Sequence, residues 1–459
     1  MSSLVNLFLN NVKKHKSRKA IIINDKKSIT FDALNHLSNY YVLELQNNEI
    51  KKGDVICIAG VKEFDSIAIL IASLKLGVIY SFFDPESPKK RILDIFKKCK
   101  PAGIFGDSII KKKTESFLKF NKVKFFNLKY QNNKKISKIR LNNHKVNEFN
   151  YSEPAYIQFT SGSTGKPKGV LIKQVSLINF IKWTVEEYSK NQKHVFTNIN
   201  PLYFDNSVFD IYASLFTGNT LVFFHKFELS DPLNLIKKID IFKCSIIFSV
   251  PSFYIYLNKL NILKKNNLKS VKKIIFGGEG YPKAQLKSFF DLYCSRIDFY
   301  NVYGPSECTC ICSSYKINKN DFKDLKGLPN LGKIIGLFDF LLIDKKNRVV
   351  KDKGELCLIG PNVGLGYFND QDQTKKSFIQ NPLNKRFIDK IYKTGDVVLI
   401  DKNSNLKFAN RIDNQIKHLG YRIELDEIVH ALHLVSGITE AYVFQHYLND
   451  ISTIIAVVS

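Results

Sequence analysis

The chain has 459 residues, 44% of them hydrophobic, and a formal net charge of +27. This length exceeds one ordinary hydrophobic core, so we expect two or three folded domains and exclude a disordered chain. The 69 lysines and arginines are scattered along the whole chain, which argues against nucleic acid as a partner. The positive field can still attract an anionic small molecule or an acidic protein.

The cysteines indicate the redox compartment of the protein, and the apolar segments indicate whether it spans a membrane. Eight cysteines without the spacing of a disulfide framework indicate a reducing compartment, and no signal peptide is predicted, so we expect a cytoplasmic protein. Cys308, Cys310 and Cys312 alternate along the chain, which fits a metal site or one face of a strand. The lack of a histidine-rich partner cluster favours the strand. The longest apolar segment, residues 66–83, is interrupted by a lysine and a glycine, and predicts a helix and a strand rather than a membrane span.

The first third of the chain alternates strand-like and helical patterns. Residues 20–31 predict a short hairpin, residues 54–59 a buried strand, residues 64–76 a helix, and residues 78–83 a second strand. Strands that alternate with helices form parallel sheets with crossover connections. The sequence therefore predicts an α/β fold.

A loop rich in glycine, hydroxyl and lysine residues follows the apolar run 156–159. Residues 160–169 consist of Thr, Ser, Gly, Lys and Pro alone. Backbone N–H groups turned inward by the glycines, together with the hydroxyls and lysines, suit a polyphosphate. The loop is not a Walker A motif, because Lys166 is followed by Pro167. A flexible linker is the alternative interpretation.

An aspartate in an apolar setting comes next. Asp205 lies in the segment Leu-Tyr-Phe-Asp-Asn-Ser-Val-Phe. It fits the N-cap of a helix, because Asp before an apolar run is common there. It also fits a buried carboxylate that needs a cationic partner from a ligand.

Four more motifs follow in order. Residues 277–280 read Gly-Gly-Glu-Gly after a predicted strand, which fits a ligand site or a tight turn. Residues 301–307 read Asn-Val-Tyr-Gly-Pro-Ser-Glu, residues 392–396 read Tyr-Lys-Thr-Gly-Asp, and residues 410–417 read Asn-Arg-Ile-Asp-Asn-Gln-Ile-Lys. An aromatic face suits a nucleotide base, and a carboxylate suits Mg²⁺ or a cis-diol.

In this order, the motifs resemble those of the adenylate-forming enzymes, over nearly the whole chain. That family includes acyl-CoA synthetases, luciferases and the amino-acid adenylation domains of nonribosomal peptide synthesis, and the nearest branch includes D-alanine–carrier protein ligases. The resemblance implies a reaction of an amino acid with ATP and Mg²⁺ that gives aminoacyl-AMP and pyrophosphate. The phosphopantetheine thiol of a carrier protein then takes the aminoacyl group.

The resemblance also implies the domain organisation. We expect a large AMP-binding domain, residues 1–412, of two doubly wound sheets and a β-rich subdomain. Its expected parts are residues 1–150, 151–330 and 331–412. A truncated small α+β domain, residues 413–459, is expected to follow, without the family segment that carries a catalytic lysine.

The family's nucleotide-binding and catalytic roles carry over by motif position. The expected catalytic residues are Thr160, Lys168, Glu307 and Arg411, with Glu307 as the Mg²⁺ ligand. Tyr303 is expected against the adenine, and Asp396 on the ribose hydroxyls. The expected nucleotide-binding residues are Thr160, Ser161, Gly162, Ser163, Thr164, Gly165, Gly278, Glu279, Asn301, Tyr303, Gly304, Ser306, Asp396 and Arg411.

The resemblance further implies where the amino acid lies. Asp205 is expected to hold the α-ammonium group. Beyond Asp205 and Asn206 the expected lining is uncharged and mostly apolar, so the hypothesis is a neutral, small to medium apolar amino acid. The expected substrate-binding residues are Asp205, Asn206, Phe209, Phe248, Ile275, Gly277, Val302, Cys310 and Ile311.

Two alternative functions stay open at this level. The first is an acyl- or aryl-CoA ligase, whose acid has no ammonium group for Asp205. The second is an adenylate-forming protein that is inactive without a C-terminal segment supplied in trans, because the family's catalytic lysine is missing. Asp413 is expected as the hinge between the large and small domains.

Overall fold

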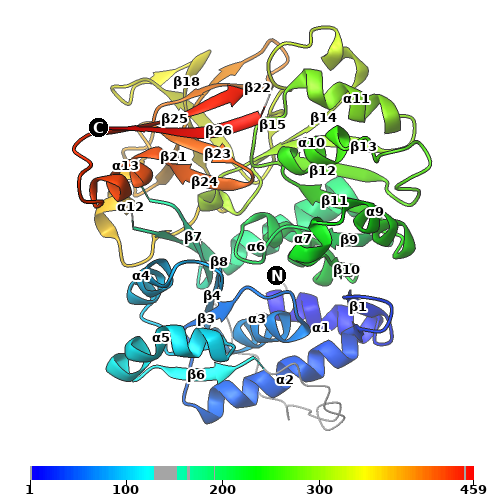
Figure 1. Ribbon diagram of the computed structural model, residues 1–459, viewed down its shortest axis with the longest axis vertical. Coiled ribbons are helices and arrows are strands. Elements are labelled where there is room, and N and C mark those ends of the chain that lie inside the picture. The colour runs from blue at the N-terminus through cyan, green and yellow to red at the C-terminus, as the bar shows by residue number, and fades with distance from the viewer. Residues whose placement is uncertain (1–2, 129–151, 163–165, 191, 449–450) are drawn as a thin grey trace.

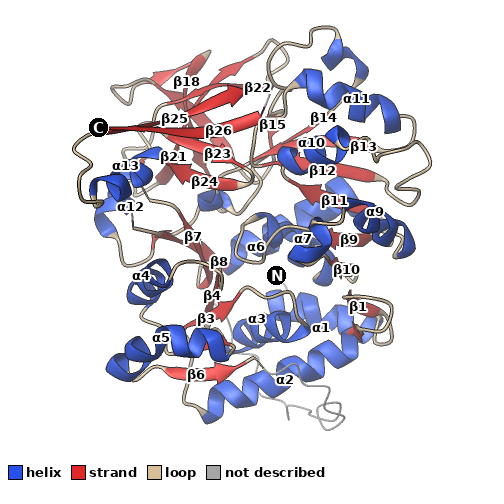
Figure 2. Cartoon of the chain, viewed as in Figure 1, coloured by secondary structure: helices blue, strands red, loops and turns tan. Residues whose placement is uncertain are grey.

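The computed structural model describes residues 3–128, 152–162, 166–190, 192–448 and 451–459. The described residues form sheets of nine, seven and six strands, followed by two small two-stranded sheets. Figure 1 shows the elements of the first residues (blue) at the lower end of the molecule and the last elements (red) near the upper end. Helices flank the two largest sheets, whereas the region around the six-stranded sheet consists mainly of strands (Figure 2). The mixed α/β class is as expected.

The seven-stranded sheet is parallel in its middle. Its order is β19-β8-β7-β4-β3-β5-β6, and β3 pairs in parallel with both β4 and β5. Every residue of β3 and β4 is buried, which explains their continuous apolar sequence. The strands are β3 (Val55–Ala59), β4 (Ile79–Phe83), β5 (Gly103–Gly106), β6 (Lys124–Asn127), β7 (Pro154–Thr160), β8 (Lys168–Lys173) and β19 (Gly366–Tyr367).

The nine-stranded sheet has the order β15-β14-β13-β12-β11-β9-β10-β1-β2. The predicted hairpin forms as β1 and β2, and β1 also pairs in parallel with β10, about 200 residues later in the chain. The strands are β1 (Lys19–Ile22), β2 (Ser28–Thr30), β9 (Val195–Asn198), β10 (Thr220–Phe223), β11 (Ile246–Ser249), β12 (Lys273–Gly277), β13 (Asp298–Tyr303), β14 (Ser313–Lys316) and β15 (Lys333–Ile334).

Both large sheets draw strands from either side of residue 150. The hairpin β1–β2 joins the later sheet, whereas β7 and β8 join the earlier one. Pairing between strands so far apart in the chain leaves no local sequence signal. The division into subdomains at residue 150 therefore stays a prediction, since each sheet contains strands from both sides of that residue. One hydrophobic cluster contains buried residues from both sheets, such as Phe83 of β4 and Phe248 of β11, and therefore joins them.

One helix has the bounds that its sequence predicts. The helix expected over residues 64–76 forms with those bounds, and Gly77 ends it with a left-handed φ of 71°. The helices of the large sheets are α1 (Leu4–Lys14), α2 (Phe31–Asn47), α3 (Phe64–Leu76), α4 (Lys89–Cys99), α5 (Ser108–Asn121), α6 (Gln174–Thr184), η2 (Val185–Ser189), α7 (Asn206–Leu215), α8 (Lys226–Leu229), α9 (Pro232–Ile241), α10 (Pro251–Lys259), α11 (Lys283–Tyr293), η3 (Ser306–Cys308) and η4 (Lys319–Phe322).

The rest of the chain contains the β-rich sheet and a small C-terminal part. The six-stranded sheet has the order β17-β16-β18-β21-β20, with β22 paired to β21. Two hairpins, β23–β24 and β25–β26, flank α13 in sequence. The elements are β16 (Asp339–Ile343), β17 (Val349–Val350), β18 (Lys353–Ile359), α12 (Gln371–Ser377), β20 (Phe378–Gln380), β21 (Lys390–Ile400), β22 (Leu406–Arg411), β23 (Gln415–His418), β24 (Tyr421–Glu424), α13 (Leu425–His433), β25 (Ala441–Leu448) and β26 (Ile451–Val458).

Two sequence expectations are wrong. The alternating cysteines at 308, 310 and 312 do not form a strand face, because η3 and two residues with positive φ precede β14. Gly366 and Tyr367 were expected in the β-rich part, but they pair with β8 as the edge of the seven-stranded sheet. Within the described ranges, no group of three His, Cys, Asp or Glu residues could hold a metal ion. None of the described helices has the length and apolarity needed to cross a membrane.

Candidate active site

A cavity lies at the carboxyl ends of β11, β12 and β13 and is covered by the β23–β24 hairpin. Its volume is about 130 Å³. The carboxyl edge of parallel strands is where α/β sheets bind ligands. Fourteen of the residues expected at the site line this cavity, namely Thr160, Ser161, Asp205, Asn206, Phe248, Gly278, Val302, Tyr303, Gly304, Ser306, Cys310, Ile311, Asp396 and Arg411.

The remaining expected residues lie outside the lining. Phe209 and Ile275 are buried, and Phe209 packs edge-on against Phe248 with ring centroids 5.1 Å apart. The Asn301 side chain donates to the Asn330 carbonyl at 2.8 Å instead of facing the cavity. Ser163, Thr164 and Gly165 lie outside the described residues. The other expected residues that do not line the cavity are Gly162, Lys168, Gly277, Glu279 and Glu307.

Two glycines of the site allow close backbone approach. A Cβ atom at Gly277 would lie 2.4 Å from the Val302 carbonyl oxygen, and one at Gly304 would lie 2.3 Å from the Cys310 carbonyl oxygen. Such contacts cannot be relieved by rotating a side chain. The two glycines are therefore needed for strand packing, whether or not a ligand also approaches them.

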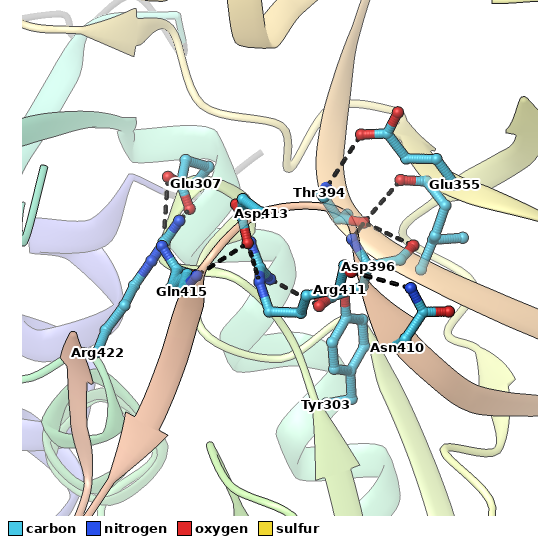
Figure 3. Close-up of polar contacts among 12 residues, drawn as sticks. Tyr303, Glu307, Glu355, Thr394, Asp396, Asn410, Arg411, Asp413, Gln415 and Arg422 are labelled. Atoms are coloured by element: carbon cyan, nitrogen blue, oxygen red, sulfur yellow. Dashed lines mark hydrogen bonds and ion pairs between the residues drawn. The ribbon is translucent and has the colours of Figure 1, made fainter. Parts of the chain in front are cut away.

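The expected ribose side of the cavity is a network of short hydrogen bonds (Figure 3). Asp396 accepts from the Tyr303 hydroxyl and from Arg411 Nη1, each at 2.6 Å. Arg411 also forms a bidentate ion pair with Asp413, in which Nε and Nη2 donate to the two carboxylate oxygens at 2.6 and 2.7 Å. Burial raises the pKa of Asp413, but the hydrogen bonds and charge of Arg411 outweigh it and hold that pKa below its ordinary value. Arg411 therefore connects the expected ribose carboxylate to the expected hinge.

The expected metal ligand is buried and paired. Glu307 accepts from the Tyr367 hydroxyl at 2.7 Å. Its two oxygens lie 3.2 and 3.1 Å from Arg422 Nη1 (Figure 3). Burial raises the pKa of Glu307, but the charge of Arg422 and the hydrogen bond from Tyr367 outweigh it, so the carboxyl pKa lies below its ordinary value. An ionised carboxylate fits Mg²⁺, a cation that prefers oxygen ligands. Arg422 occupies the same oxygens in this structure.

Unpartnered donors support a phosphate site. The Thr160 hydroxyl and the Arg422 Nε–H are buried and have no hydrogen-bond partner among the described residues. Both residues line the cavity. Buried polar groups normally have partners, and an oxyanion between these donors would supply one. The residues present therefore fit a nucleotide phosphate.

Asp205 holds the N-cap position of α7 but does not cap it. Its side chain makes no cap hydrogen bond; instead it accepts a hydrogen bond from the Ser306 hydroxyl. Burial raises the pKa of Asp205, against the opposing effects of Ser306 and of the Lys417 and Arg422 charges. The helix-cap interpretation is therefore wrong for the side chain. Ser306, expected at the α-phosphate, contacts Asp205 in this structure.

Several cavity residues were not expected at the site. Gln158 lies in the lining and donates to the Tyr203 carbonyl at 2.6 Å. Lys417 and Arg422 reach the cavity from β23 and β24. Lys417 ends the motif at 410–417 and Arg422 follows that motif by five residues, so their closeness to it was an available signal. Tyr367 gave no such signal, because its contact with Glu307 depends on the pairing of β19 with β8.

Comparison with known proteins assigns a family. A family model described as AMP-binding enzyme matches residues 8–368. The D-alanine–D-alanyl carrier protein ligase of Bacillus cytotoxicus is 31% identical over 84% of this chain and 75% of that protein. Bacitracin synthase 3 of Bacillus licheniformis is 28% identical over 92% of this chain, which is 6% of that synthase. Bacitracin synthase 1 of the same organism is 29% identical over 96% of this chain and 8% of its own length. The chain thus spans a small part of these two synthases.

Solved structures share the fold at low sequence identity. An artificially fused adenylation–PCP di-domain, NpsA–ThdA from Klebsiella oxytoca, superimposes with a TM-score of 0.82 at 20% identity, over 100% of this chain and 88% of that one. The crystal structure of IdnL1 superimposes with a TM-score of 0.84 at 19% identity, over 100% and 92%. These likenesses concern the fold alone. Because the family model matches most of its length, this chain belongs to the AMP-binding, adenylate-forming enzyme family.

Proposed function

We propose that the chain activates an amino acid with ATP as aminoacyl-AMP and passes it to the phosphopantetheine thiol of a carrier protein. The observation that carries the amino-acid part is Asp205. Its carboxylate lines the cavity, does not cap its helix, and accepts a hydrogen bond from Ser306 alone among the described residues. A substrate ammonium group would supply the missing cation.

In the first half-reaction, an oxygen of the amino acid carboxylate attacks the α-phosphorus of ATP. The new P–O bond forms as the bond between the α-phosphorus and the bridging oxygen breaks, and that oxygen leaves with pyrophosphate. Asp396 positions the ribose hydroxyls, and Thr160, Lys168 and Arg411 supply hydrogen bonds and positive charge to phosphate oxygens. Glu307 is the residue that would hold Mg²⁺, which would supply further positive charge to the phosphates.

In the second half-reaction, the thiol attacks the aminoacyl carbonyl and AMP leaves. No side-chain nucleophile is needed, because the acyl-AMP is already activated. The D-alanyl carrier protein ligase relative supports a carrier protein as the acceptor. We propose Asp413 as the hinge between the half-reactions, because it lies in the link between the six-stranded sheet and the β23–β24 hairpin.

The side-chain end of the cavity favours an uncharged amino acid. Phe248, Val302, Cys310 and Ile311 supply a mostly apolar lining beyond Asp205. We propose a neutral, small to medium apolar substrate. A pocket of this kind separates substrates that differ by one methylene by about 1–3 kcal/mol, so two or three related amino acids should react.

The test is amino-acid-dependent exchange between ATP and pyrophosphate, with a panel of L- and D-amino acids and the whole chain. Exchange with one or a few apolar amino acids is expected. Asp205→Ala should lower kcat/KM by about 30-fold or more, since truncating one partner of a buried charge pair costs about 2–5 kcal/mol. The matched control is Asp401→Ala, because Asp401 lies in a turn outside the cavity lining.

Two outcomes would contradict the proposal. Equal exchange with Asp, Lys or Arg would exclude the apolar pocket. Full activity of Asp205→Ala with a simple acyl or aryl acid and CoA would instead assign the acyl- or aryl-CoA ligase reaction.

A further inference from the structure

The segment that forms α4, β5, α5 and β6 concentrates positive charge. Residues 89–127 contain twelve lysines and arginines and three acidic residues, a net charge of +9 out of the +27 of the whole chain. The two helices lie next to each other in Figure 1, and Phe96 of α4 packs against Phe117 of α5 with ring centroids 5.7 Å apart. One part of the surface thus carries a third of the net charge, although lysines occur along the whole chain.

The outer side of α5 also carries two large apolar side chains. Phe120 is 88% exposed and Ile109 is 70% exposed, and no other large hydrophobic side chain among the described residues is as exposed as Phe120. Eleven residues separate the two, which is about three turns, so both lie on one line along the helix. Lys112 and Lys119 lie about a quarter turn around the helix from this line. We call these four residues, together with Lys111, the α5 face.

A groove of about 480 Å³ runs beside this face, between α5 and β6. Its lining combines lysines with apolar side chains, namely Lys111, Lys112, Lys119, Leu118, Val123 and Phe125. Glu115 also lines the groove and pairs with Lys119 at 2.8 Å, whereas Lys111 and Lys112 make no ion pair with any described residue. An amphiphile with an anionic head fits this combination, because lysines can bind the head while the apolar surface contacts the remainder.

We propose that the α5 face binds to a membrane surface that contains anionic phospholipids. Phe120 and Ile109 enter the headgroup region, and the lysines beside them contact the lipid phosphates. Amphipathic helices at membrane surfaces combine lysines on one side with large apolar side chains on the other. The proposal goes beyond the amino-acid activation proposed above and does not rest on it.

The apolar line distinguishes a membrane from the other anionic partners that positive charge alone would suit. A nucleic acid binds such a surface mainly through its phosphates, and that binding does not require two exposed apolar side chains. Protein interfaces are depleted in lysine, whereas here lysines flank the apolar line closely. Anionic lipids supply phosphates and an apolar layer together.

The test measures sedimentation of the whole chain with vesicles at physiological ionic strength. The two compositions are phosphatidylcholine alone and phosphatidylcholine with about one third phosphatidylglycerol, and the anionic vesicles should bind at least about tenfold more tightly. Ile109→Ser with Phe120→Ser should weaken that binding about tenfold or more, because the apolar contact is lost. The matched control is Phe227→Ser with Ile241→Ser, at helical positions that are 72% and 62% exposed, and should leave binding unchanged.

A second pair of variants tests the charge. Lys111→Gln with Lys112→Gln should weaken binding to the anionic vesicles about 25-fold, since each lysine near such a surface contributes about a fivefold factor. Lys345→Gln with Lys346→Gln, a neighbouring pair of exposed lysines elsewhere in the chain, should change it less than about twofold.

Three outcomes would overturn the proposal. Equal binding to the neutral and anionic vesicles would exclude recognition of anionic lipids, and an equal loss in both control variants would exclude the α5 face as the contact. Loss on removal of the lysines but not of Ile109 and Phe120 would assign a general anion-binding surface, such as one for nucleic acid. Vesicle binding needs neither ATP nor an amino acid, so a failed pyrophosphate exchange would count against the proposed function alone.

Discussion

Two largely buried basic side chains at two interfaces of the molecule differ in the groups they bind. Lys62, in the connection after β3, donates to the backbone carbonyls of Asn198, Ile199 and Phe224 at 2.8, 2.8 and 2.6 Å. It thereby joins the seven-stranded sheet to the ends of β9 and β10. Arg422, in β24, instead joins the β23–β24 hairpin to the carboxylate of Glu307.

The difference separates a permanent interface from an exchangeable one. The carbonyls bound by Lys62 belong to the fold, and no step of the proposed reaction requires them. Glu307 is a group that a metal would also bind. The apolar core follows the same division: among the described residues after Asp413, only Leu425 and Val443 are buried hydrophobics, and neither belongs to a core cluster. The C-terminal part is therefore positioned mainly by polar contacts, which a charged ligand can replace.

Removing Lys62 should break the permanent interface and have the largest effect on stability. Lys62→Met leaves three backbone carbonyls without their buried donor, so the free energy of unfolding should fall by about 3 kcal/mol. Urea denaturation measures this change. Lys26→Met, at an exposed position, should change stability little. A loss no larger than that of the control would show that Lys62 does not hold the two sheets together.

The carboxylate of Asp205 should respond to pH, because it is buried and no described lysine or arginine forms a direct ion pair with it. Burial raises its pKa, so the carboxyl takes up a proton at a higher pH than an exposed aspartate does. Below that pKa, the KM for the amino acid should rise about tenfold per pH unit, since only the ionised form attracts an ammonium group. Pyrophosphate exchange from pH 5 to 8 measures the profile.

The control for this pH dependence is Asp205→Asn, whose side chain cannot ionise. Its KM should be high and nearly independent of pH over the same range. A wild-type profile equally flat would show that Asp205 does not bind the ammonium group.

The sequence predicted the positions of helices and strands better than it predicted which strands pair with each other. Helix 64–76 and the strand before it follow from local apolar patterns, and the cavity residues Asp205, Tyr303 and Asp396 follow from short motifs. The pairing of β19 with β8 joins residues about 200 positions apart and depends on which edge of a sheet remains available. No local pattern encodes that choice.

The exchangeable contacts were the least predictable part of the site. Glu307 belongs to the motif at 301–307 and Arg422 follows the motif at 410–417, but neither motif indicates that the two side chains bind each other. The cysteines at 308 and 312 show the converse error: alternation predicted a strand, whereas the left-handed residues Thr309 and Cys310 turn the chain there. A positive φ at non-glycine residues has little sequence signature.

The smallest effect is expected from the ion pair at the rim of the exchangeable interface. Arg91 in α4 contacts Glu427 in α13 at 3.3 Å, with 33% and 28% of the side chains exposed. Solvent screens such a pair, so Arg91→Ala should lower the free energy of unfolding by less than about 1 kcal/mol. Urea denaturation checks this value against Lys89→Ala, an exposed change in the same helix. A loss as large as that of Lys62→Met would mean that the rim, rather than the contact of Arg422 with Glu307, holds the C-terminal part in place.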